Sequence, residues 1–313
     1  MSNLEVAPRE AVCAGDATAG PVHELMDGRD VVLGGTRGMA VTRTLPNRDR
    51  RMVGAWCFLD AYGPATHDMR VPPHPHTGLQ TVSWLLAGEL LHRDSLGSQQ
   101  LIRPGQLNLM TAGRAIAHSE ESTVDTTLHG VQLWVALPDS DRQGEPAFAH
   151  HPDLPVVTDN GLTATVLIGQ FADVVSPARA YTPIVGAEVT VDGGAGARLP
   201  LEPDFEYAVL CLAGDADVDG VPLAPGPLLY LGTGRTAMAM SGSARLLLLG
   251  GEPFEERIVM WWNFVGRSHD EIVADREDWM AGRRFGPVVG YEGDPLPAPE
   301  LPTTTLKARG RQR

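Results

Sequence analysis

The chain contains few cysteines, few aromatic residues and no long apolar run. Its three cysteines, Cys13, Cys57 and Cys211, lie far apart. An odd number of scattered cysteines provides neither a disulfide framework nor a cysteine zinc site, so we expect reduced thiols and a cytoplasmic location. The apolar run Leu246–Leu249 is much shorter than the ~18 residues of a membrane span. Residues 1–16 contain no apolar segment typical of a secretory signal.

Positive charge is also scarce. The 25 lysines and arginines face 39 aspartates and glutamates, which gives a net charge of −14 and an isoelectric point near 5.1. A phosphate backbone would be repelled by this excess of negative charge, so direct nucleic-acid binding is not expected. The acidic balance is compatible with ordinary solubility and equally with a protein partner that carries a basic patch.

Glycine and proline, in contrast, are abundant, with 35 and 25 copies. They separate short apolar segments such as 81–86 and 131–135, a rhythm typical of many short strands joined by turns. The proline-rich stretch 151–155 is the best candidate for a domain boundary. We therefore expect an all-β protein with a disordered leader at 1–25, a first barrel domain at 26–150, a second at 156–262, and a helix with a surface-wrapping tail at 263–313.

A faint internal repeat supports two similar halves. The sequence LLAGE at 85–89 resembles CLAGD at 211–215, and a Pro-Gly turn follows each copy, at 104–105 and at 225–226. Chance similarity among common turn residues is the alternative. Duplication of one β-unit is the interpretation we favour, and it predicts two small barrels in tandem.

One helix is expected near the C-terminus. Ser268 and Glu271 form a capping box, in which each side chain bonds a backbone N–H of the first turn. Apolar residues then recur at helical spacing up to Met280, and Gly282 is a typical C-terminal stop.

Two pairs of residues carry the chemistry. In Pro72-Pro73-His74-Pro75-His76 the prolines favour an extended chain, in which residues two apart point the same way. His118 and Glu120 have the same spacing. Three imidazoles and one carboxylate suit a divalent first-row transition metal, and the lack of thiolate disfavours a structural zinc site. A solvated histidine loop and a surface glutamate are the alternative reading.

These residues lie in segments that resemble a known family. The segments HPHTGLQTVSWLLAG at 74–88 and MTAGRAIAHSE at 110–120 closely resemble the pirin family of the cupin superfamily. FLD at 58–60 and GVQLWV at 130–135 extend the likeness. It is strong over 55–138 and continues more weakly to about residue 290.

The resemblance implies two antiparallel cupin barrels (double-stranded β-helices) face to face, with one metal in the N-terminal barrel. The implied ligands are His74, His76, His118 and Glu120, the four residues already singled out by spacing. The metal is usually iron, so Fe²⁺ is expected, although such ligands also accept Mn, Ni, Cu or Zn. Many cupins place a ligating glutamate where this chain has Gln80, which is expected either to hydrogen-bond a ligand or to lie on the surface.

The remaining site residues follow from strand alternation and from the distribution of histidine. Gln132 and Trp134 share one face of their strand, and they line the substrate pocket if that face is the barrel interior. A simple core position is the alternative for Trp134. His92 and His129 match no ligand position and are not expected to bind the metal. The second barrel has no histidine between 151 and 269 and is expected to be metal-free.

For function, the resemblance implies a dioxygenase that cleaves flavonols such as quercetin with O₂, with Glu120 as a ligand and as the base that takes the substrate proton. The alternative is a non-enzymatic, metal- or redox-dependent regulator that binds a protein partner. A cupin isomerase or sugar-binding module fits the motifs less well. The protein is expected to be a monomer, and the sequence does not identify its physiological substrate.

Overall fold

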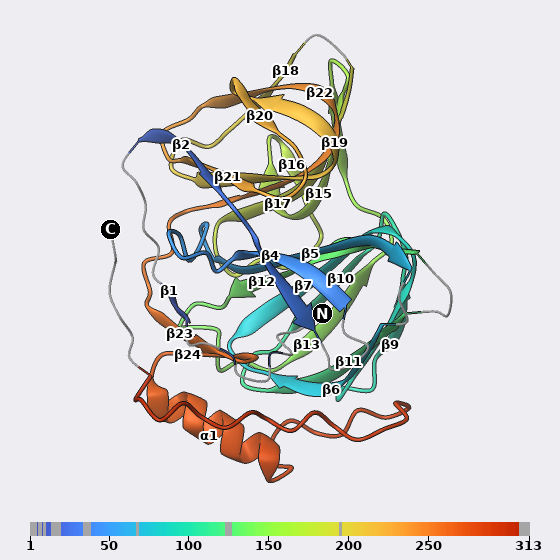
Figure 1. Ribbon diagram of the computed structural model, residues 1–313, viewed down its shortest axis with the longest axis vertical. Helices are drawn as coiled ribbons and strands as arrows, with labels where there is room; N and C mark the ends of the chain where they lie inside the picture. Colours follow the sequence, from blue (N-terminus) through green and yellow to red (C-terminus); the bar gives the residue numbers. More distant parts are fainter. Residues whose placement is uncertain are drawn as a thin grey trace.

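The computed structural model describes residues 5, 8, 11–13, 20–33, 39–66, 69–122, 127–193 and 196–306. Figure 1 shows two β-barrels stacked along the long axis, with one short helix and the C-terminal segment beneath the N-terminal barrel. Every pairing between the strands is antiparallel; a single isolated bridge, between Thr77 and Phe264, is parallel. The expected all-β architecture of two tandem barrels is confirmed.

The N-terminal barrel consists of two sheets. Its larger sheet has the strand order β13-β10-β7-β12-β5-β4-β3, and its smaller sheet has the order β6-β11-β8-β9. The strands are β3 (Arg29–Leu33), β4 (Met39–Leu45), β5 (Trp56–Thr66), β6 (Arg70–His76), β7 (Leu79–Ala87), β8 (Leu90–Asp94), β9 (Gln99–Ile102), β10 (Leu107–Thr111), β11 (Ile116–Ser122), β12 (Thr127–Ala136) and β13 (Ala147–His151).

The C-terminal barrel is one ten-stranded sheet whose main path is β14-β15-β17-β22-β19-β21-β2. Its strands are β2 (Pro21–Met26), β14 (Val156–Asp159), β15 (Leu162–Phe171), β16 (Val174–Val175), β17 (Ile184–Asp192), β18 (Ala197–Pro200), β19 (Glu206–Val218), β20 (Val221–Leu223), β21 (Leu228–Gly232) and β22 (Ala237–Gly251). The proline-rich segment 152–155 lies between β13 of the first barrel and β14 of the second.

The run Leu246–Leu249 explains how the barrels pack together. Leu246 and Leu248 belong to the core inside the C-terminal barrel, whereas Leu247 and Leu249 belong to a core that both barrels share. Alternate residues of a strand point to opposite faces, so a strand placed between two apolar regions needs leucine at every position.

Part of the expected disordered leader is in fact ordered. Residues 21–26 form β2, which pairs with β21 of the C-terminal barrel, and Ala11–Cys13 form β1, which pairs with β23. Strand pairing at a sheet edge is made by backbone groups, so it leaves little apolar pattern to find in the sequence. Most of the remaining leader lies outside the described residues.

Tryptophan side chains of the first barrel hydrogen-bond to the second. The Trp56 indole N–H reaches the carbonyl oxygens of Val185 and Gly250, both at 3.2 Å. The Trp84 indole donates to the Glu188 carboxylate. These bonds are buried and join β5 and β7 to β17 and β22, so the two barrels form one packed unit.

The C-terminal segment contains β23 (Ile258–Trp261), β24 (Phe264–Gly266) and helix α1 (His269–Met280). Ser268 caps α1 by accepting from the Glu271 N–H, and Gly282, with φ of 67°, follows its C-terminal end. The helix predicted from the capping box is therefore confirmed. Among the described residues, no helix is long and apolar enough to cross a membrane.

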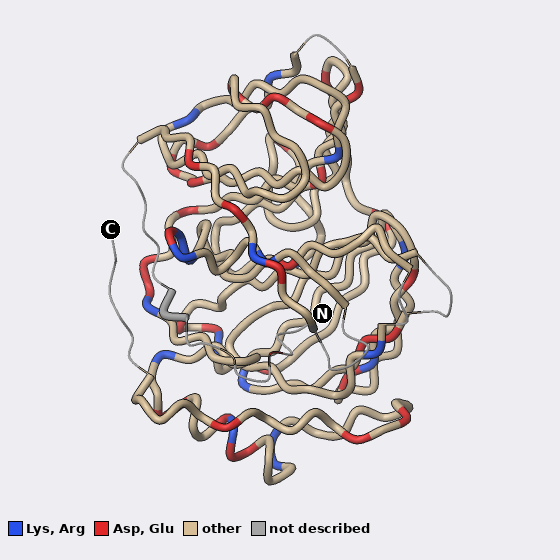
Figure 2. Tube along the Cα trace, viewed as in Figure 1, with Lys and Arg blue, Asp and Glu red and all other residues tan. Residues whose placement is uncertain are grey.

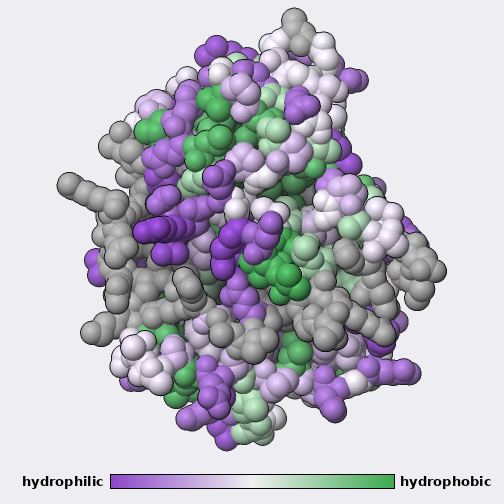
Figure 3. Space-filling model, in the orientation of Figure 1, coloured by the Kyte–Doolittle hydropathy of each residue, from purple (hydrophilic) through white to green (hydrophobic). Residues whose placement is uncertain are grey.

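The surface carries no large region of a single charge in the view drawn. Figure 2 shows basic and acidic residues interspersed over both barrels and the C-terminal segment. In Figure 3, apolar residues over the C-terminal barrel are broken up by hydrophilic ones. Large exposed apolar side chains include Val32, Val175 and Val289, which come from different segments.

We expect Trp56→Phe to lower the free energy of unfolding by about 2–4 kcal/mol, because it opens a void and removes the donor of two buried carbonyl groups. Denaturant unfolding of the full chain measures this. Trp279 is half-buried and lies outside the interface between the barrels, so Trp279→Phe should lower the free energy of unfolding by less. An unchanged unfolding curve for Trp56→Phe would contradict the assigned role of this side chain.

Candidate metal centre

The two predicted pairs lie on neighbouring strands of the smaller sheet. His74 and His76 are on β6, and His118 and Glu120 are on β11. His118 stands directly opposite His74, and a bulge separates His118 from Glu120. All four side chains are buried, with at most 2% of their surface exposed.

The prolines of β6 are compatible with its place in the fold. Pro72, Pro73 and Pro75 lack the N–H that a strand donates to its neighbours. Strand β6 is at the edge of its sheet, with β11 on one side, so proline is tolerated there. The fixed φ of proline keeps the strand extended and holds His74 and His76 on one face, as the spacing predicted.

The three histidine rings converge. The Nε2 atoms of His76 and His118 are 3.1 Å apart, and the ring centroids of His74, His76 and His118 are separated by 4.4–5.1 Å. His74 donates from Nδ1 to the Pro72 carbonyl oxygen at 2.7 Å, which leaves the lone pair on Nε2. One nitrogen from each ring lies within 4.8 Å of the other two, a separation that one metal ion can bridge.

Burial keeps these imidazoles neutral. It lowers the pKa of His74 from 6.5 to about 4. It also lowers the pKa values of His76 and His118 well below the ordinary value, and repulsion from the neighbouring histidines acts in the same direction. A neutral imidazole offers the lone pair that a metal needs. The donor set therefore fits a divalent transition metal.

Glu120 faces the larger sheet across the barrel. The Ser83 hydroxyl on β7 lies 3.3 Å from Glu120 Oε1 and 3.1 Å from Gln132 Oε1 on β12. Glu120 also lies within 4.8 Å of ligand atoms of His118 and His92. The barrel interior thus places a carboxylate beside the histidines, with a hydroxyl in contact with it.

Gln132 and Trp134, expected in the pocket, both point into the N-terminal barrel. Both are fully buried. The Trp134 ring stacks on Phe58 with centroids 4.0 Å apart, and its ring centroid is 5.4 Å from that of His76, which it meets edge to face. These contacts place Trp134 against a candidate ligand as well as in the core.

Gln80 is neither a surface residue nor in a described contact with the four residues. Its amide nitrogen donates to the Thr111 hydroxyl at 2.9 Å and to the Arg179 carbonyl oxygen at 3.1 Å. Arg179 belongs to the second half of the chain, so Gln80 links the two barrels. Of the two expectations for Gln80, the surface position is wrong, because β7 runs along the interface between the barrels.

His92 was not expected to bind the metal, but the structure places it beside the candidate ligands. His92 lies opposite Glu120 in the register of β8 and β11, and its Nδ1 is 3.3 Å from His118 Nδ1. His129, also set aside, is half-buried and faces the backbone of Leu212 in the other barrel. The signal for His92 was present, because His92-Arg93-Asp94 repeats the two-residue spacing of the other pairs. Among the described residues, both groups that could hold a metal lie in the N-terminal barrel.

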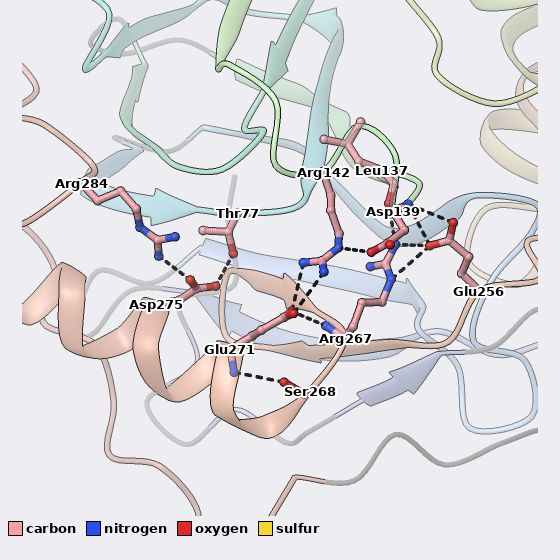
Figure 4. Close-up of polar contacts among 10 residues, drawn as sticks. All are labelled: Thr77, Leu137, Asp139, Arg142, Glu256, Arg267, Ser268, Glu271, Asp275 and Arg284. Carbon is pink, nitrogen blue, oxygen red and sulfur yellow. Dashed lines mark hydrogen bonds and ion pairs between the residues drawn. The ribbon is translucent and has the colours of Figure 1, made fainter.

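The C-terminal segment is anchored to the end of β6. Figure 4 shows the Thr77 hydroxyl donating to Asp275 on α1, at 2.7 Å, while Arg284 pairs with the same carboxylate. A second group joins Arg142 and Arg267 to the carboxylates of Glu271 and Glu256. Thr77 directly follows His76, so α1 is tied to the strand that carries two candidate ligands.

We expect the metal-free protein to lose stability as the pH falls from about 6.5 to about 4. The folded-state pKa of His74, about 4, lies below its unfolded value of 6.5, so protons bind preferentially to the unfolded chain in this range. His74→Gln should reduce the loss by about 3 kcal/mol in urea unfolding at the two pH values. Equal losses in wild type and His74→Gln would refute this explanation.

We expect Thr77→Val to lower the free energy of unfolding by about 1–3 kcal/mol, because the buried Asp275 carboxylate loses a donor. Hydrogen exchange should become faster in α1 before the barrels are affected. Thr158→Val, at an exposed position on β14, is the matched control and should have little effect. Unchanged exchange in α1 would show that this contact does not anchor the helix.

Comparisons with known proteins give consistent results. The family description Pirin matches residues 38–135, and Pirin C-terminal cupin domain matches residues 186–286. A Pseudomonas aeruginosa protein that carries the provisional name quercetin 2,3-dioxygenase is 49% identical over 85% of this chain and 87% of its own length. A pirin-like protein of Caulobacter vibrioides is 38% identical over 83% of this chain and 94% of its own.

A solved structure matches as well. The crystal structure of quercetin 2,3-dioxygenase from Acinetobacter baumannii superimposes with a TM-score of 0.87 at 44% sequence identity, covering 91% of this chain and 98% of that one. The likeness therefore spans both barrels and reaches beyond the segments that hold the candidate ligands. With both halves matched and high identity over most of its length, the chain belongs to the pirin family and consists of two cupin domains.

Proposed function

We propose that the protein is a metal-dependent dioxygenase that cleaves flavonols such as quercetin with O₂. It binds one divalent ion, Fe²⁺, through His74, His76, His118 and Glu120. The observation that carries this proposal is the burial of three neutral imidazoles close to one another in a single barrel, with the Glu120 carboxylate close to one of them, His118. The relatives and the solved structure named quercetin 2,3-dioxygenase support the choice of substrate class.

The imidazoles and the carboxylate have separate tasks. The three imidazoles act as ligands, since they are neutral at neutral pH. A divalent ion held by these residues would supply Lewis acidity. Glu120 takes the proton of the substrate hydroxyl at a carboxylate oxygen, because it is the anionic group of the quartet and the imidazole lone pairs are committed.

The facing sheet provides the surroundings of the substrate. Ser83 contacts Glu120 and Gln132, so its hydroxyl holds the carboxylate in place when the proton moves. Trp134 meets His76 edge to face, so it holds one candidate ligand ring in position. Burial of the cluster keeps competing water away from the reacting atoms.

The first experiment is metal analysis of protein purified without added metal, followed by anaerobic loading with Fe²⁺. We expect one ion per chain and O₂ uptake on addition of flavonols. Uptake with other enediol-type chelators would widen the substrate class. A fully loaded protein that consumes no O₂ with any of these compounds would favour the alternative, a metal-dependent regulator that binds a protein partner.

The second experiment compares two adjacent glutamates. Glu120→Gln should lower metal occupancy and reduce kcat by about 10²-fold or more, because it removes both a ligand charge and the base. Glu121→Gln is the matched control, since Glu121 points to the other face and pairs with Arg70 and Arg93. Full metal content and full turnover in Glu120→Gln would refute the role of this residue.

A further inference from the structure

We propose that His92 and Asp94 are positioning residues that fix the tautomer of His118, so that the Nε2 lone pair of His118 points to the metal. This inference rests on the metal site of the proposed function and adds two residues to it. It concerns strand β8, from which no ligand was expected.

The three strands carry matching pairs. Strands β6, β11 and β8 lie side by side, and each places two residues with two-residue spacing on the same face. The register sets His118 opposite both His74 and Asp94, and sets Glu120 opposite His92. The β8 pair is as buried as the candidate ligands, with His92 3% and Asp94 1% exposed. Two more ionisable groups at this depth require partners, and they find them in each other and in His118.

The hydrogen bonds form one chain. Asp94 Oδ2 lies 3.1 Å from His92 Nε2, and His92 Nδ1 lies 3.3 Å from His118 Nδ1. At the other end, His118 Nε2 faces His76 Nε2 at 3.1 Å. Every ring nitrogen of His92 and His118 therefore has a defined neighbour.

The protons along this chain can be assigned from its fixed end. Asp94 Oδ1 accepts from the backbone N–H groups of Leu96 and Ser98, which leaves Oδ2 as an acceptor for His92. Since Asp94 accepts, His92 donates from Nε2, and a neutral His92 then carries its lone pair on Nδ1. That lone pair accepts the Nδ1 proton of His118. The second nitrogen of His118 is then left with a lone pair, directed to the site shared with His74 and His76.

Phe148 holds in place the hydrogen-bonded chain from Asp94 through His92 to His118, which we call the relay. Its ring stacks on that of His92, with centroids 4.3 Å apart and an interplanar angle of 13°. This contact fixes the plane of the His92 ring, and with it the direction of both nitrogens. Partners outside the ligands often orient metal-binding histidines in this way, and losing one typically weakens metal binding about 10–100-fold.

A different set of ligands, which includes His92, is also possible in this cluster. His92, His118 and Glu120 also bring ligand atoms within 4.8 Å of one another, so His92 itself is a possible ligand. In that arrangement His118 binds through Nδ1, and its protonated Nε2 points at the other two histidines. The relay instead lets all three lone pairs of His74, His76 and His118 converge, which is why we favour it.

Two variants are designed to remove the hydrogen-bond acceptor that faces His118 Nδ1. His92→Phe keeps a ring to stack on Phe148 but removes the acceptor for His118. Asp94→Asn keeps its carbonyl oxygen on Leu96 and Ser98, so its amide N–H₂ faces His92 and forces the opposite tautomer. In both variants His118 loses the acceptor at Nδ1. His129→Phe, on the same barrel but outside the cluster, is the control.

The experiment measures Co²⁺ binding to the full chain by competition with a chelator, together with the hyperfine-shifted, exchangeable imidazole N–H signals of the Co²⁺ protein. We expect both variants to bind Co²⁺ about 10–100-fold more weakly, still at one ion per chain. Wild type and His92→Phe should both show three such signals, with one of them exchanging faster in His92→Phe. The double variant should be no weaker than His92→Phe alone, because Asp94 acts through His92.

Three outcomes would overturn the proposal. Unchanged Co²⁺ affinity in His92→Phe would show that His92 does not orient His118. Loss of one imidazole signal in that variant would show that His92 is itself a ligand. Additive losses in the double variant would mean that Asp94 acts independently of His92. Circular dichroism and thermal unfolding of the metal-free variants separate these results from misfolding. Failure of wild type to bind any metal would instead count against the proposed function.

Discussion

The site depends on one constraint, the antiparallel register of β6, β11 and β8. This register places six ionisable side chains on one interior face, where water cannot solvate them. Each must then be neutral, or paired, or able to bind a metal. The histidines satisfy this requirement by losing their charge, as the lowered pKa values of His74, His76 and His118 show. A shift of the register by one residue would turn every one of these groups outward.

The rest of the fold holds that sheet in place. Trp56 and Trp84 fasten the larger sheet of the first barrel to the second barrel. On the other side, Leu296 donates to the carbonyl oxygen of Pro73, and Val265 donates to that of Thr77. Strand β6 is an edge strand rich in proline and can make few ladder bonds of its own. The C-terminal segment compensates by bonding to the backbone at both ends of the His-Pro-His stretch.

The sequence was informative where the pattern is local. Residues two apart on an extended strand share a face whatever the fold, so the common orientation of each candidate ligand pair could be predicted, and so could that of Gln132 and Trp134. The capping box of α1 is local in the same way. The internal repeat predicted two tandem barrels, and the family resemblance added their cupin fold, because pairing between distant strands has no local signature.

Other features depend on distant neighbours. His92 and Asp94 have the same spacing as the two predicted pairs, but only the position of β8 beside β11 brings them next to His118 and Glu120. Gln80 lies where many cupins have a ligand, yet here it bonds to Arg179 of the other barrel. The strand Pro21–Met26 depends on an edge provided by β21, about two hundred residues later.

The contrast between the two barrels follows from the energetics of burial. The interior of the C-terminal barrel is filled by aliphatic side chains such as Val189, Val209, Leu246 and Leu248, and each contributes about 1.5–3 kcal/mol when fully buried. Part of the interior of the N-terminal barrel is occupied by polar groups around the candidate metal site. Less stabilisation from apolar burial is therefore available there. A barrel with a polar interior is less stable alone, and its shared core with an apolar barrel offsets the loss. The second domain therefore supports the first through the core that they share.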